Sequence, residues 1–158
     1  MSEAYIEIML QSLKKKIQVL DEIIRLNQVQ KEVLENEVSD PEDFDRTVES
    51  KSDCIDQLTQ LDSGFEKLFE RVKAEINLNK EQYKKQIREM QGMIRTITDK
   101  SMEIQSQEAR NKDLMTLKFS RVKQQAKQVR SSQKIANDYY KNMAKINYVE
   151  PQFMDNKK

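Results

Sequence analysis

Apolar side chains recur in alternating steps of four and three residues along most of the chain. The pattern is regular over residues 3–37, again over 44–76, and again over 115–147. Apolar residues at this spacing share one side of an α-helix and are typical of helices that pack lengthwise against each other. No stretch alternates with period two. The sequence therefore predicts an all-α fold, an elongated antiparallel helical hairpin or bundle of three to four long, coiled-coil-like helices.

The first predicted helix has a wider apolar stripe than one partner helix would need. Met9, Ile23 and Leu26 lie beside its main seam, so we expect this helix to contact two neighbours. Asn27 and Lys31 interrupt the seam itself. Polar residues at such positions usually fix the register or the number of packed helices.

A short acidic segment separates the first two predicted helices. Asp40 is placed to cap the second helix, and Pro41 suits its first position. The next two residues, Glu42 and Asp43, complement the helix dipole. So short a connection predicts an antiparallel hairpin. Gly64 does not change the phase of the second seam, so we expect the helix to continue through it.

The second half of the chain is less regular. At residues 77–80 the seam changes phase, which fits either a turn or a bend in one very long helix. Residues 105–113 contain a single apolar residue, Ala109, and fit either a connection or a solvated stretch of helix. Periodicity is lost after Ile146, and Pro151 follows. We divide the single domain into three parts: an N-terminal hairpin scaffold at 1–76, C-terminal helices at 77–147 and a flexible tail at 148–158.

The last predicted helix, residues 115–147, carries the surface that we consider most informative. Its seam consists of Met115, Phe119, Val122, Ala126, Val129, Gln133, Ala136, Tyr140, Met143 and Asn147. The following cations, with no acidic residue among them, lie between Leu114 and Asn137: Lys118, Arg121, Lys123, Lys127, Arg130 and Lys134. A narrow stripe of small and flexible apolar side chains on a cationic helix is typical of a surface that accepts another helix. We expect this stripe to stay available for a foreign helix.

Composition excludes several classes of function. The chain has no histidine, two glycines and one cysteine, Cys54. It therefore lacks the commonest metal ligand and general base, any glycine-rich phosphate loop and an internal disulfide. Its carboxylates lie along helix faces without clustering. We expect no enzymatic activity, no catalytic residue, no metal site and no cofactor.

Charge is divided unevenly between the two halves. Residues 1–75 hold 18 acidic and 10 basic side chains, whereas residues 76–158 hold 9 acidic and 18 basic ones. Either the halves neutralise each other within the fold, or the basic half attracts an acidic partner. Residues 114–137 contain one aromatic and no nucleic-acid-binding module, so we expect no nucleic acid. No signal sequence or long apolar run is present, and we expect a cytoplasmic protein without membrane insertion.

Four segments together point to one family. The first is the helix from Ser12-Leu13-Lys14 to Val33-Leu34-Glu35, before the acidic turn. The second runs from Glu49-Ser50-Lys51 to Ile55-Asp56-Gln57-Leu58, and the third from Ile104 through Arg110-Asn111-Lys112 to Leu114. The fourth is the tail Phe153-Met154-Asp155-Asn156-Lys157-Lys158. The second is similar to a charged E-x-K…L-x-x-L helix, the third to an asparagine-centred helix and the fourth to an aromatic–Asp–basic tail. In this order the segments resemble those of the FlgN-type flagellar export chaperones.

The resemblance implies a small cytoplasmic chaperone that uses no ATP. It would bind the amphipathic terminal helices of hook–filament junction proteins and pass them to the type III export gate. The contact stripe would consist of Met115, Phe119, Val122, Ala126, Val129, Tyr140 and Met143, rimmed by Lys118, Lys123 and Arg130. Phe153 and Asp155 would contact the export gate. Two alternatives stay open: a chaperone for the filament cap or flagellin, and a structural coiled-coil protein whose seam builds a homo-oligomer.

Overall fold

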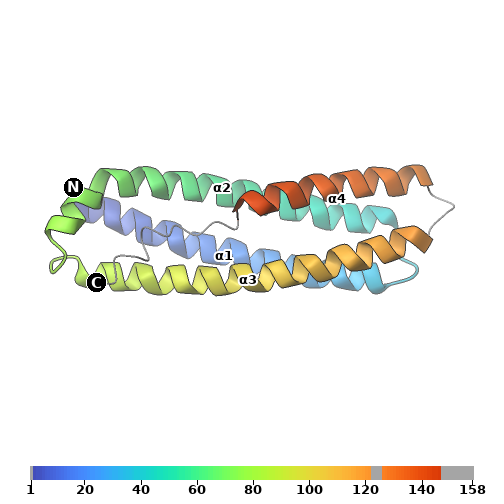
Figure 1. The fold of residues 1–158 in the computed structure, drawn as a ribbon, viewed down its shortest axis with the longest axis horizontal. Helices are drawn as coiled ribbons and strands as arrows, with labels where there is room; N and C mark the ends of the chain where they lie inside the picture. Colours follow the sequence, from blue (N-terminus) through green and yellow to red (C-terminus); the bar gives the residue numbers. More distant parts are fainter. Residues whose placement is uncertain (1, 122–125, 147–158) are drawn as a thin grey trace.

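The computed structural model describes residues 2–121 and 126–146, nearly all of them helical and none in a strand. It contains α1 (Ser2–Glu35), α2 (Pro41–Leu78), α3 (Lys84–Arg121) and α4 (Ala126–Ile146). The four helices lie lengthwise in an elongated bundle (Figure 1). The predicted all-α bundle is therefore confirmed.

The helices alternate in direction, so that α1 and α3 run one way and α2 and α4 run the other (Figure 1). The α1 helix packs along both α2 and α3, as its wide apolar stripe predicted, and α4 packs against α2. With 21 residues against 38, α4 covers only about half the length of α2. The α4 helix thus lies in the half of the bundle near the α1–α2 turn, which we call the four-helix half, and the other half consists, among the described residues, of α1, α2 and α3 (Figure 1).

The core is a long apolar seam centred on α1. This helix contributes eight buried large side chains: Ile6, Met9, Leu10, Leu13, Leu20, Ile23, Leu26 and Leu34. Burying one such side chain stabilises a fold by roughly 1.5–3 kcal/mol. The α1 helix is therefore the element on which α2 and α3 are assembled.

The acidic segment caps α2 as the sequence predicted. The Asp40 carboxylate accepts a hydrogen bond from the Glu42 backbone N–H at 3.3 Å, and the Asp43 carboxylate accepts one from the Asp40 N–H at 3.3 Å. These reciprocal bonds form a capping box, with Pro41 at the start of the helix. The α2 helix continues without interruption through Gly64.

The Asp40→Ala variant is expected to lose about 1 kcal/mol of unfolding free energy, because it removes the side-chain partner of backbone donors at the start of α2. Denaturant unfolding followed by helical circular dichroism measures the loss. The control is Asp56→Ala, at an exposed position in the middle of the same helix. Equal stability of Asp40→Ala and the parent chain would contradict a capping role.

The two segments that periodicity left undecided are now assigned. The phase change at 77–80 marks the end of α2 and the start of a turn, because α2 ends at Leu78, residues 79–83 form the turn and α3 begins at Lys84. Residues 105–113 lie inside α3. The prediction of one helix over 115–147 was wrong, because the chain reverses between the end of α3 at Arg121 and the start of α4 at Ala126 (Figure 1). Residues 122–125, Val-Lys-Gln-Gln, contain neither glycine nor proline, and the spacing of apolar residues does not register a reversal.

Candidate functional site

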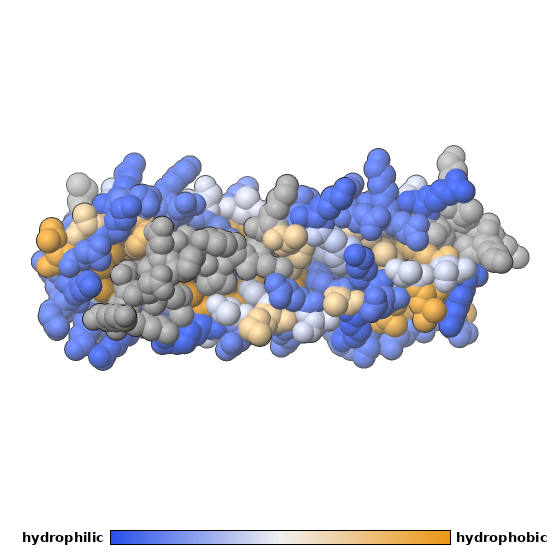
Figure 2. All heavy atoms as spheres, viewed as in Figure 1, coloured by the Kyte–Doolittle hydropathy of each residue, from blue (hydrophilic) through white to orange (hydrophobic). Residues whose placement is uncertain are grey.

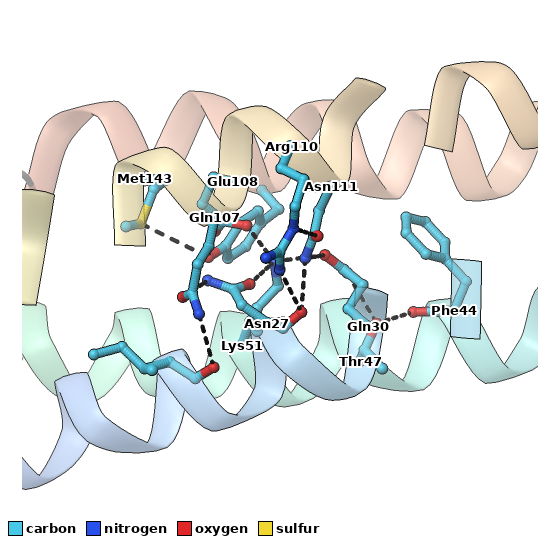
Figure 3. Close-up of polar contacts among 12 residues, drawn as sticks. Asn27, Gln30, Phe44, Thr47, Lys51, Gln107, Glu108, Arg110, Asn111 and Met143 are labelled. Atoms are coloured by element: carbon cyan, nitrogen blue, oxygen red, sulfur yellow. Dashed lines mark hydrogen bonds and ion pairs between the residues drawn. The ribbon is translucent and has the colours of Figure 1, made fainter. Parts of the chain in front are cut away.

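A layer of polar side chains crosses the apolar core within the four-helix half of the bundle (Figure 3). We call it the polar layer, and its buried members are Asn27 and Gln30 of α1, Thr47 and Lys51 of α2, Glu108 and Asn111 of α3, and Tyr139 of α4. Unpaired polar groups at such depth are strongly destabilising, so their partners must be accounted for. All four helices meet at this level.

Lys51 lies at the centre of the layer and is fully buried, with an exposed fraction of 0 %. Its ammonium donates to Asn27 Oδ1 at 2.8 Å and to Gln30 Oε1 at 3.0 Å, both on α1. The third donor forms an ion pair with Glu108 Oε1 of α3 at 2.5 Å. Burial lowers the pKa of Lys51, and the Glu108 carboxylate opposes that shift. One side chain of α2 is thus tied to α1 and α3.

The amide side chains of the layer complete these ties. Gln30 Nε2 donates to Thr47 Oγ1 at 2.9 Å, and Asn111 Nδ2 donates to the Asn27 carbonyl at 2.9 Å (Figure 3). Asn27 Nδ2 donates to Gln107 Oε1 at 3.0 Å. Sliding one helix past another by a single turn would break several of these bonds at once. The register role that the sequence predicted for Asn27 is consistent with its place in this network.

The α4 helix enters the layer through Tyr139. The Tyr139 hydroxyl donates to Glu108 Oε2, and the ammonium of Lys51 lies 4.3 Å from the centroid of the tyrosine ring, a cation–π contact. The two carboxylate oxygens of Glu108 therefore have donors on two different helices, Lys51 on α2 and Tyr139 on α4. Burial, together with the Glu108 carboxylate, raises the pKa of Tyr139.

The apolar stripe predicted for a partner faces the bundle itself. Met115 and Phe119 are only 3 % and 5 % exposed, and Met143 is buried as well. The ring of Phe119 packs edge-to-face on Phe44 of α2, with centroids 5.3 Å apart. The expectation that the stripe is accessible was therefore wrong for these three residues. Apolar periodicity is the same whether a helix packs on its own chain or on a foreign one.

The predicted cationic rim is also used within the fold. The Lys118 ammonium donates to the carbonyl oxygens of Val33 and Asn36, at 3.1 and 2.8 Å, and to Ser39 Oγ. It thereby caps the C-terminal end of α1, and burial lowers its pKa. Arg130 is exposed, as expected of a rim residue.

The remaining predicted residues are distributed as follows. Tyr140 is half-buried, and the ammonium of Lys112 lies 5.6 Å from its ring centroid. Val122, Lys123, Phe153 and Asp155 lie outside the described residues, as do the side chains of Ala126 and Val129.

The inward face of α4 differs at two positions from the predicted seam. Among the described side chains it consists of Ser132, Ala136, Tyr139 and Met143, whereas the sequence pattern selected Gln133 and Tyr140 in place of Ser132 and Tyr139. The prediction carried the phase of α3 through the reversal, so Tyr139 was missed. A seam fitted to 126–146 alone would have found it.

Of the four helices, α4 has the fewest buried large side chains among those described. Only Tyr139 and Met143 are large, compared with eight on α1. The buried Ser132 hydroxyl has no hydrogen-bond partner, which destabilises the docked state by about 1–3 kcal/mol. Among the described side chains, α4 therefore contributes the fewest large apolar contacts to the bundle.

On the face drawn in Figure 2, the visible hydrophobic atoms of the described residues lie in groups among hydrophilic ones. The exposed large apolar side chains among the described residues are scattered over all four helices and a turn: Ile8, Val38, Leu78, Met102, Leu117 and Ile135. Scattered single residues of this kind are normal on a folded protein.

A comparison with protein families decides the assignment. Residues 1–146 match the family described as FlgN protein. The chain belongs to the FlgN family. It is therefore a flagellar export chaperone, and the match includes all four helices and the whole polar layer. Comparisons with curated proteins and with solved structures give no match.

The described part of this FlgN-family chain has neither a membrane-spanning helix nor a metal site. None of its helices is long and apolar enough to cross a membrane. No group of acidic or cysteine side chains among the described residues is arranged to hold a metal ion.

The buried Tyr139 is expected to make this FlgN-family chain less stable at alkaline pH. The pKa of Tyr139 is raised by burial, whereas a phenol in the unfolded chain ionises near about pH 10. The stabilisation is thus fully present below about pH 10 and falls by about 1 kcal/mol per pH unit above it. Unfolding free energies at about pH 9 and 11 should show a smaller loss for Tyr139→Phe than for the parent chain. Identical losses would contradict the burial of the phenol.

Proposed function

We propose that this FlgN-family chaperone binds the amphipathic terminal helices of hook–filament junction proteins in the cytoplasm and keeps them competent for export. Such a helix exposes an apolar stripe until the subunit is assembled. The stripe has to be covered reversibly, without driving the subunit into a fold that blocks secretion. A helical chaperone that uses no ATP can do this only by packing its own apolar surface against the client helix.

The observation that carries this proposal is the composition of the inward face of α4. Its described part holds only two large side chains, Tyr139 and Met143, beside Ala136 and the unpartnered hydroxyl of Ser132, yet it covers the apolar core and the polar layer in half of the bundle. In our proposal α4 moves away from α2, and the client helix packs on the face that α4 leaves. Of the predicted stripe residues, Met115 and Phe119 of α3 would then face the client. Val122, Ala126, Val129, Tyr140 and Met143 would contact it only where the displaced segment folds back over the bound helix.

Charge supports an acidic or weakly charged client helix. The exposed Arg130 and the cationic positions around it would flank the groove mouth. Lys123 would join this rim, whereas Lys118 is occupied by the end of α1. We further propose that Phe153 and Asp155, in the tail, contact the export gate.

Affinity capture tests the proposed client. The full chain is immobilised, and the two junction proteins, the filament cap protein and flagellin of the same bacterium are offered separately. We expect stoichiometric retention of a junction protein and its loss when its terminal helix is removed. Retention of the cap protein or flagellin alone would assign the chaperone to that client instead.

Sedimentation tests the remaining alternative, a structural homo-oligomer. A client-binding chain is expected to sediment as the same species over a wide range of concentration and to form a new species when client is added. A tight oligomer that no client disperses would favour the structural role.

A further inference from the structure

The geometry points to the polar layer as the element that selects the client helix. We infer that a helix replacing α4 must bring a tyrosine, or another hydrogen-bond donor, to the level of Tyr139. Glu108 is the acceptor that this donor has to satisfy. This inference rests on the proposed function, because it concerns the same groove. It adds the chemical class of the helix that fits.

The first reason is the way in which the donors in the layer are divided. The three N–H groups of Lys51 are used entirely by α1 and α3, on Asn27, Gln30 and Glu108. None of them is freed when α4 departs. Lys51 therefore holds Glu108 Oε1 in place whatever lies in the fourth position of the bundle.

The second reason is the state of Glu108 without α4. The Tyr139 hydroxyl is the donor to Glu108 Oε2 among the described residues. A helix that covers the groove without supplying a donor would bury that oxygen unpaired. An unpaired carboxylate oxygen weakens binding by about tenfold to a hundredfold.

The third reason favours tyrosine over other donors. The aromatic ring of Tyr139 lies against the Lys51 ammonium, 4.3 Å from ring centroid to nitrogen, while its hydroxyl reaches Glu108. Phenylalanine would keep only the first contact, and the hydroxyl of a serine lies too close to the backbone to reach Glu108 in place of the tyrosine hydroxyl. A tyrosine in the middle of the apolar stripe meets both groups at once.

The rest of the α4 face defines the shape of the selected helix. Ser132 and Ala136 precede Tyr139 and are both almost fully buried, so large side chains at those two positions would not fit. Met143 follows one turn later and is also buried. The expected client helix therefore carries small, small, tyrosine and flexible apolar residues at relative positions 0, 4, 7 and 11.

A peptide exchange experiment tests the inference directly. The receptor is the full chain carrying Ala136→Asp, which places a charge at a buried position and keeps α4 from competing; Met143→Asp provides a second receptor. Circular dichroism verifies that each remains helical. The probe is a peptide of residues 126–146 of this chain, and its affinity is compared with that of the Tyr139→Phe peptide. A Lys141→Ala peptide, altered at an exposed position, is the control.

We expect the parent and control peptides to bind about equally, and the Tyr139→Phe peptide to bind at least about tenfold more weakly. The preference should disappear or reverse in a receptor that also carries Lys51→Met and Glu108→Leu. Equal affinities of the parent and Tyr139→Phe peptides, or no binding of any peptide, would overturn the inference. The proposed function is judged separately, because it fails only if the full chain does not capture a junction protein.

Discussion

A chain carrying Glu108→Leu is expected to unfold with a free energy about 3–5 kcal/mol below that of the parent. The substitution removes the carboxylate that pairs with Lys51 at 2.5 Å and leaves that ammonium buried at 0 % exposure. It also leaves the Tyr139 hydroxyl with only the weak acceptor Met143 Sδ, 3.7 Å away. Denaturant unfolding followed by circular dichroism measures the change.

Two companion variants identify the cause of the loss. Adding Lys51→Met to Glu108→Leu should restore most of the stability, because a buried ion pair replaced by apolar side chains of similar size is close to neutral. Glu103→Leu, at an exposed position of α3, should change stability by less than about 0.5 kcal/mol. A single Glu108→Leu variant as stable as the parent would mean that the layer does not hold the helices together.

The second large effect concerns the client. A chain carrying Ala136→Asp is expected to bind its junction protein about tenfold or more tightly than the parent, because α4 no longer covers the groove. When the competent state is only a small fraction of the population, the apparent affinity is reduced by that fraction. Placing a carboxylate at the buried Ala136 position removes this reduction. Calorimetric titration with the purified client measures the change.

The matched control introduces the same charge one residue away. Asn137 is exposed, so Asn137→Asp should leave the affinity unchanged. Weaker binding by Ala136→Asp would mean that a docked α4 forms part of the site. Unchanged binding would place the client elsewhere on the bundle.

The sequence predicted the parts of the fold that local chemistry determines. Asp40 and Pro41 mark the start of α2 because a capping carboxylate and a proline both suit that position and few others. The seam of the first helix was wide enough to predict two neighbours. Gly64 was read correctly, because a single glycine weakens a helix without ending it.

The spacing of apolar residues could not predict the reversal between α3 and α4. Met115, Phe119 and Met143 were correctly identified as seam residues, but a seam position does not specify which helix covers it. The connection contains no glycine or proline, so no turn signal was present. Its omission shifted the phase of α4 and selected Tyr140 in place of Tyr139.

Only part of the polar layer could be predicted from the sequence. Asn27 and Lys51 interrupt the seams of two consecutive helices, which is a signal for a buried polar level. Glu108 and Asn111 fall in the polar stretch 105–113, which fitted a solvated helix equally well. Whether such a stretch faces water or a lysine depends on contacts between residues about 80 positions apart, and no local pattern contains that information.

The distance between α2 and α4 with and without client tests the central claim most directly. Spin labels are attached at Asp56→Cys on α2 and Lys141→Cys on α4, both exposed, in a chain carrying Cys54→Ala. A reference pair joins Asp56→Cys to Glu32→Cys on α1. If the client helix takes the place of α4, adding a stoichiometric amount of junction protein lengthens the α2–α4 distance and leaves the α1–α2 distance unchanged. An α2–α4 distance that stays the same while the client is fully bound would contradict the displacement of α4.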